Sequence, residues 1–107
     1  MKPYRIIIAD DHSLIRQGIK TLIAREASLQ LVAEAANGLE LLEVLRTHGA
    51  DMVILDITMP HLNGLEAMAE IRKINAEVDI LMLTMHTNSQ YFFQAITAGA
   101  HGYLMKE

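Results

Sequence analysis

The sequence predicts an α/β domain built on a doubly wound parallel sheet of five strands. Short apolar runs alternate with longer segments of helical period. Each run plus its helix takes roughly 20–25 residues, as parallel βαβ units require. The 107 residues are enough for one domain with a single core, and neither a linker nor a repeat interrupts them.

Composition and charge exclude several classes of protein. The chain has no cysteine, so disulfides and thiolate metal sites are excluded. A net charge of -4 argues against a basic nucleic-acid-binding face. The apolar run at residues 6–9 is too short for a signal peptide, and no segment is long enough to span a bilayer. We therefore expect a cytoplasmic protein with no membrane contact.

The first half of the chain predicts two strands and two helices. Residues 5–9 form a buried strand, and from Ser13 the apolar period becomes that of an amphipathic helix. The stripe of this helix consists of Leu14, Ile15, Gly18, Ile19, Leu22 and Ile23. Residues 29–35 predict a strand near an edge, because polar residues interrupt it. Residues 39–48 predict a helix closed by Gly49, with Leu41, Leu42, Val44 and Leu45 facing inward.

The second half continues the alternation. A strand at residues 52–55 runs into Asp56, after which Pro60 and Gly64 force a loop. A helix from 65 to about 75 places Met68 and Ile71 inward. A strand at 79–84, a helix at 89–98 and a strand at 102–105 follow. With right-handed crossovers, five such strands favour the flavodoxin-like order 2-1-3-4-5.

Four of the five predicted strands end in polar residues, namely Asp10 with Asp11, Asp56, Thr84 and Lys106. In this strand order the three aspartates should converge at the carboxyl edge of the sheet. Carboxylates about 4 Å apart repel by roughly 4 kcal/mol at an effective dielectric near 20, and Mg²⁺ suits oxygen ligands of this kind. With a hydroxyl and a lysine, the set suits phosphoryl chemistry. The alternative is that the aspartates only cap helices.

These strand-end residues belong to a longer pattern. It consists of Asp10-Asp11, Asp56-x-x-Met59-Pro60-x-x-x-Gly64, Thr84 and Tyr103-x-x-Lys106. In this order and at these spacings, the chain resembles the receiver domain of two-component response regulators along its whole length. The amino-acid sequence around these motifs resembles that of the NarL/FixJ-like subfamily, which carries a C-terminal LuxR-type helix-turn-helix.

The resemblance implies a role for each of these residues. Asp56 would accept a phosphoryl group from a sensor histidine kinase. Mg²⁺ would be held by Asp56, Asp11 and the backbone carbonyl of Thr58, with help from Asp10. Lys106 and Thr84 would bind the phosphoryl oxygens. Movement of Thr84 would let Tyr103 rotate inward, which makes a two-state switch. The output would be transcription regulation through a DNA-binding domain absent from this chain.

Histidines near the predicted edge raise further possibilities. Thr58 and His86, each two residues beyond a strand end, are candidates for tuning the lifetime of the phosphoryl group. His12, His61 and His86 together suggest a zinc site, a weaker hypothesis because no helical pair at i, i+4 accompanies them.

The chain departs from the family at its end. The family has a fifth helix after the lysine, whereas this sequence ends at Glu107. We therefore expect residues 1–107 to be a C-terminally incomplete receiver domain, with an exposed apolar patch that favours a homodimer.

Three other functions remain as alternatives. A stand-alone receiver would act by protein contact alone. An aspartyl-phosphate phosphatase of the haloacid dehalogenase type would need an aspartate at position 58, which is Thr58 here. A flavin-binding module would need a phosphate-binding loop where Asp10 and Asp11 stand. We expect no enzymatic activity other than self-phosphorylation and autodephosphorylation.

Overall fold

The computed structural model describes residues 2–56, 64–84 and 102–105, with the backbone alone for residues 64, 65, 84 and 102–105. The elements in chain order are β1 (Tyr4–Ala9), α1 (Ser13–Ala24), β2 (Leu29–Ala35), α2 (Gly38–His48), β3 (Met52–Asp56), α3 (Gly64–Ile74), β4 (Asp79–Thr84) and β5 (Gly102–Met105). The helix predicted at residues 89–98 lies outside the described residues. Among the helices that are described, none is long and apolar enough to cross a membrane.

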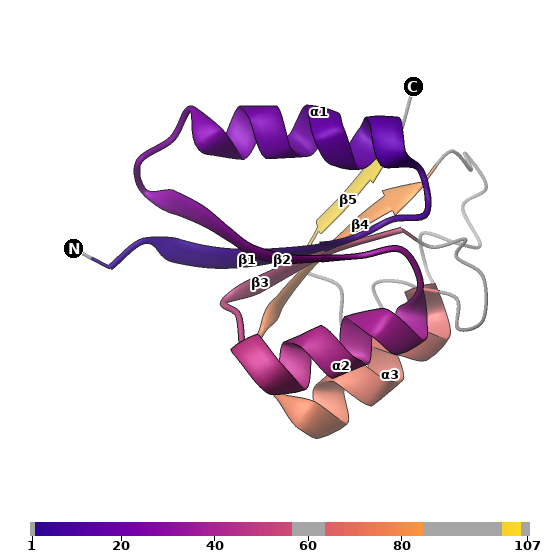
Figure 1. Ribbon diagram of the computed structural model, residues 1–107. Coiled ribbons are helices and arrows are strands. Elements are labelled where there is room, and N and C mark those ends of the chain that lie inside the picture. Colours follow the sequence, from indigo (N-terminus) through magenta and orange to yellow (C-terminus); the bar gives the residue numbers. More distant parts are fainter. Residues whose placement is uncertain (1, 57–63, 85–101, 106–107) are drawn as a thin grey trace.

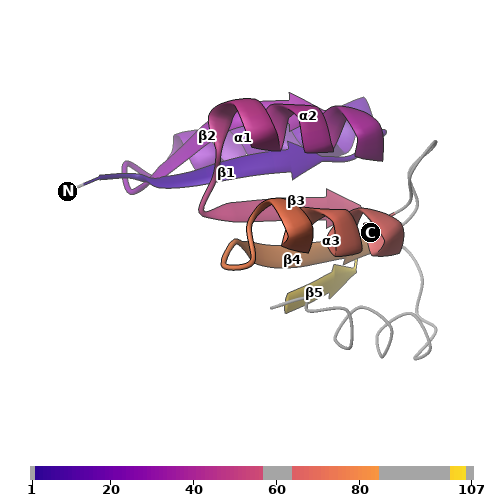
Figure 2. The same cartoon turned by 90° about the horizontal axis from the view of Figure 1, so that it is seen from below.

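The strands form one parallel sheet in the order β2-β1-β3-β4-β5, which is the predicted order. Helix α1 lies on one face of the sheet, and α2 and α3 lie on the other (Figure 1). Seen from below, α2 lies beside α3, with α3 over β3 and β4 (Figure 2). β2 is an edge strand, as its polar residues predict.

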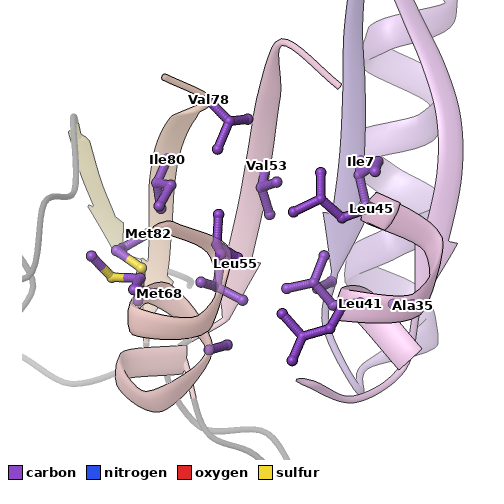
Figure 3. Close-up of a cluster of buried hydrophobic side chains, with 14 residues drawn as sticks. Ile7, Ala35, Leu41, Leu45, Val53, Leu55, Met68, Val78, Ile80 and Met82 are labelled. Atoms are coloured by element: carbon purple, nitrogen blue, oxygen red, sulfur yellow. The ribbon is translucent and has the colours of Figure 1, made fainter. Parts of the chain in front are cut away.

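The larger core lies between the sheet and helices α2 and α3 (Figure 3). Alternate residues of a strand point to opposite faces, so Val53 and Leu55 of β3 both point to this side. They meet Leu41 of α2 and Met68 of α3, and all four side chains are fully buried. The inward positions predicted for α2 and α3 are confirmed for Leu41, Leu42, Leu45, Met68 and Ile71, each at most 6% exposed.

A smaller core lies on the α1 face, where Ile6 and Ile8 pack with Ile54, Leu83 and Ile23. Ile54 and Leu83 are buried on this face, at 7% and 6% exposure.

The apolar stripe predicted for α1 is only partly buried. Ile15, Ile19 and Ile23 pack on the sheet at i, i+4 and i+8. Leu14 and Leu22 are instead 85% and 61% exposed. On another flank of the helix, two salt bridges join it to β2. Glu34 lies 3.4 Å from the Arg16 Nε and 3.0 Å from the Lys20 Nζ.

Element boundaries differ from the predictions by one residue or so, and local hydrogen bonds give the reason. Helix α2 begins at Gly38 because the Asn37 side chain caps it, accepting from the amide of Glu40 at 2.9 Å. It is closed as predicted at Gly49, which has a φ of 68°. Strand β3 extends to Asp56 because that residue pairs with Leu83 of β4.

The amino edge of the sheet is held by a polar network around Tyr4. Its hydroxyl donates to an Asp79 carboxylate oxygen, and Asp51 accepts the Arg5 backbone amide at 2.8 Å. Burial, the hydrogen bond to Asp79 and the charges of Asp79 and Asp51 raise the pKa of Tyr4 from 10.0 to about 12. The network lies at the edge of the sheet opposite the strand-end aspartates.

Candidate functional site

Asp10 and Asp56 lie side by side at the carboxyl edge of the sheet. Strand β1 pairs with β3 so that Ala9 stands opposite Leu55, and the next residue of each strand is an aspartate. Both aspartate residues are fully buried, at 0% exposure. The Asp10 amide also donates to the Ala35 carbonyl of β2 at 3.0 Å, which fixes the end of β1. The strand order thus brings the two carboxylates together, as predicted.

Asp11 and His12 join this pair, and we call the four residues the Asp–His cluster. One potential ligand atom from each of Asp10, Asp11, His12 and Asp56 lies within 4.8 Å of all the others. The His12 Nδ1 is 2.8 Å from the Asp10 Oδ1, 3.1 Å from the Asp11 Oδ1 and 3.8 Å from the Asp56 Oδ2. The Asp11 and His12 side chains are 35% and 47% exposed. The cluster therefore combines a buried pair with a pair that solvent reaches.

The turn from β1 into α1 orients Asp10. His12 is the N-cap residue of α1, with an extended backbone and no side-chain cap hydrogen bond. Its backbone amide donates to the Asp10 Oδ1 at 2.8 Å, while the Arg16 guanidinium donates to the Asp10 carbonyl oxygen. Asp10 thus binds an amide that precedes the helix rather than capping its first turn. The capping alternative is wrong for Asp10.

The donors of the cluster fit a divalent cation. The carboxylate oxygens lie within 4.8 Å of one another, and two ionised carboxylates at that outer limit repel by roughly 3.5 kcal/mol at an effective dielectric near 20. Buried charges of this kind persist when they are paired or coordinate a metal. Asp10, Asp11 and Asp56 offer hard oxygen ligands, the type that Mg²⁺ prefers. The structure thus provides donors for Mg²⁺ at the predicted edge.

The other predicted site residues are described only in part. Thr58, His86 and Lys106 lie outside the described residues. Thr84 and Tyr103 are described by backbone alone. Leu83 pairs with Asp56, so the backbone of Thr84 comes one residue beyond the level of Asp56, at the same edge. Thr84 in turn pairs with Met105, the residue before Lys106.

Two residues of the site were missed as neighbours of the aspartates. The sequence pattern groups His12 with His61 and His86, yet the His12 ring contacts Asp10 and Asp11. Arg16 belongs to no predicted site, yet its guanidinium donates to the Asp10 carbonyl oxygen. Their signal in the sequence is proximity: His12 directly follows Asp11, and Arg16 lies one helical turn later.

Comparison with known proteins identifies the family. The sequence model of the response regulator receiver domain family matches residues 6–107 of this chain. Among curated relatives, the uncharacterized transcriptional regulatory protein YhcZ of Bacillus subtilis is 33% identical over 103 residues, which is 96% of this chain and 48% of that protein. The transcriptional regulatory protein DegU of Brevibacillus brevis is 35% identical over 103 residues, 96% of this chain and 44% of that protein. The chain spans about half the length of the curated relatives it matches.

Solved structures agree. A LuxR-family two-component response regulator from Aurantimonas sp. SI85-9A1 superposes with a TM-score of 0.92 at 38% identity, over 99% of this chain and 76% of that one. The signal receiver domain of NarL from Mycobacterium tuberculosis superposes with a TM-score of 0.94 at 30% identity, over 100% of this chain and 86% of that one. From the match over residues 6–107 and these relatives, the chain belongs to the response regulator receiver domain family.

Proposed function

We propose that this chain is a phosphorylation-dependent switch in which Asp56 accepts a phosphoryl group from a sensor histidine kinase. The observation that carries the proposal is the placement of Asp56. Its carboxylate is buried at the end of the central strand β3, within 4.8 Å of oxygens of Asp10 and Asp11. A strand end at the switch point of a doubly wound sheet is where such folds bind ligands.

The proposed chemistry is a covalent transfer. A carboxylate oxygen of Asp56 attacks the phosphorus of the kinase phosphohistidine, so that a P–O bond forms while the P–N bond breaks and its electron pair returns to the imidazole. Asp10, Asp11 and Asp56, with the backbone carbonyl of Thr58, would hold Mg²⁺. The bound ion would neutralise charge on the carboxylates and phosphoryl oxygens.

The remaining roles come from the resemblance. Lys106 and Thr84 would bind phosphoryl oxygens, and Tyr103 would turn inward as Thr84 moves. Thr58 and His86 would tune the lifetime of the aspartyl phosphate by contacting the attacking water. An unchanged hydrolysis rate after substituting either residue would remove that tuning role.

The output is proposed from the relatives. YhcZ and DegU are transcriptional regulatory proteins about twice the length of this chain. We propose that the switch controls transcription through a DNA-binding domain outside this sequence. We also propose that the protein acts in the cytoplasm. A stand-alone receiver is the alternative for the output. We expect no turnover of small phosphate esters, because position 58 is a threonine and supplies no carboxylate for acid–base catalysis.

Mass spectrometry after incubation with acetyl phosphate and Mg²⁺ tests the proposal. We expect one added phosphoryl group that depends on Mg²⁺ and is absent from Asp56→Asn. Asp51→Asn, at the opposite edge of the same sheet, is the matched control, because its side chain keeps an oxygen for the Arg5 amide. An adduct that persists in Asp56→Asn, or no adduct on a folded wild-type sample, would refute the proposed chemistry.

A further inference from the structure

The His12 side chain has an unusual place in the Asp–His cluster. Its ring does not cap α1, although His12 is the N-cap residue. The ring Nδ1 instead lies among the carboxylate oxygens of Asp10, Asp11 and Asp56, which belong to two different strand ends. A nitrogen donor is thus built into a group of oxygen donors.

The distances match those between ligands of one metal ion. Two neighbouring ligands of an octahedral ion with bonds of about 2.1 Å are about 3.0 Å apart, and opposite ligands are about 4.2 Å apart. The His12 Nδ1 lies 2.8 Å, 3.1 Å and 3.8 Å from the oxygens of Asp10, Asp11 and Asp56. All three values fall close to or between those limits. The ring is 47% exposed, which leaves room for it to adjust and for water to complete the coordination.

We propose that His12 is a metal ligand through Nδ1, and that it shifts the preference of the site from Mg²⁺ toward borderline divalent metals such as Co²⁺, Ni²⁺ and Zn²⁺. Mg²⁺ favours oxygen ligands, whereas imidazole nitrogen favours these transition metals. The inference rests on the metal site proposed above and adds to it the identity of the preferred ion. Neutral imidazole carries its single proton on either nitrogen, so Nδ1 can accept a metal when the proton is on Nε2.

The competing explanation is a hydrogen bond. The 2.8 Å separation from the Asp10 Oδ1 also suits an Nδ1–H donor, and the His12 backbone amide donates to the same oxygen. In that case His12 only orients Asp10, and its loss would weaken the binding of every divalent ion in proportion. The two explanations therefore differ in the ratio of metal affinities.

Titration of the purified chain with Co²⁺, followed by competition with Mg²⁺, tests the proposal in wild type, His12→Gln and His48→Gln. Glutamine keeps a polar side chain but offers an oxygen in place of the ring nitrogen. We expect His12→Gln to lose about tenfold or more in Co²⁺ affinity while Mg²⁺ affinity stays within about threefold. His48, on the exposed surface of α2, bonds only its own helix at Val44 in the described contacts and should change neither value.

Proton NMR of the Co²⁺-loaded chain gives a direct readout. Wild type should show a strongly shifted imidazole N–H resonance that is absent from His12→Gln and present in His48→Gln. Absence of this resonance from wild type, or a parallel fall in both affinities, would overturn the ligand role of His12 and leave Mg²⁺-dependent phosphorylation of Asp56 intact. Divalent-ion binding that is insensitive to Asp11→Asn would instead overturn the proposed metal site itself.

Discussion

Replacing Asp56 with asparagine should stabilise the folded chain when divalent cations are removed. The substitution keeps the size of a buried side chain and removes one of three clustered negative charges. Ligand oxygens of Asp10, Asp11 and Asp56 lie within 4.8 Å of one another, and a repulsion at that outer limit is worth roughly 3.5 kcal/mol at an effective dielectric near 20. Loss of the contact between the Asp56 Oδ2 and the His12 Nδ1, 3.8 Å apart, offsets part of this gain. Asp56 makes a further interaction that the substitution also weakens, so we expect a net gain of at most about 1 to 3 kcal/mol in the free energy of unfolding.

Urea denaturation followed by circular dichroism measures this gain. Without divalent ions, Asp56→Asn should unfold at a higher urea concentration than wild type, with an unchanged slope. With Mg²⁺ at a hundredfold excess over its dissociation constant, wild type should gain about 2.7 kcal/mol, because the ion binds only the folded state. The variant should gain much less.

Two results would refute this reasoning. Equal stability of wild type and Asp56→Asn without divalent ions would show that the carboxylates do not repel in the folded chain. An equal gain from Mg²⁺ in both proteins would show that the ion binds somewhere other than the Asp–His cluster. Asp51→Asn, outside the cluster, is the control for a general effect of charge.

Three further predictions concern the rest of the fold. The pKa of Tyr4 is raised to about 12, so the stabilisation from its protonated hydroxyl is complete below pH 10 and is lost as pH rises from 10 to 12. Over that window, the free energy of unfolding measured by urea titration should fall less in Tyr4→Phe than in wild type. Met68→Ala removes a fully buried side chain and should cost about 2 to 5 kcal/mol of unfolding free energy, measured by urea denaturation; a cost below about 1 kcal/mol would contradict that packing. Leu14→Gln with Leu22→Gln should abolish any homodimer seen by sedimentation and leave stability within about 0.5 kcal/mol. The equally polar change Leu39→Gln, on a different helix, should leave association as it was.

Much of the fold followed from local pattern. A strand that alternates between two cores needs apolar residues at every position, and residues 6–9 and 53–55 have them. Because crossovers in parallel sheets are right-handed, these runs restrict the possible strand orders to a few. The convergence of Asp10 and Asp56 then followed from the strand order alone.

The rotation of α1 did not follow from its sequence. Its predicted stripe includes Leu14 and Leu22, which stay exposed, whereas Ile15, Ile19 and Ile23 pack on the sheet. In this rotation Arg16 and Lys20 also pair with Glu34 on β2. A contact between residues this far apart in the chain depends on the packing of helix against sheet, and no local period encodes it.

The sequence by itself determined the class of fold and the position of the three aspartates at strand ends, because hydrophobic period and strand polarity are local properties, and it restricted the strand order to a few possibilities. Only the tertiary structure decided what joins those aspartates. The ring of His12 could have pointed to solvent or capped α1, and the sequence is the same in either case. Its place among Asp10, Asp11 and Asp56 depends on the turn geometry and on the register of β1 with β3, which bring two distant strand ends within reach of one side chain.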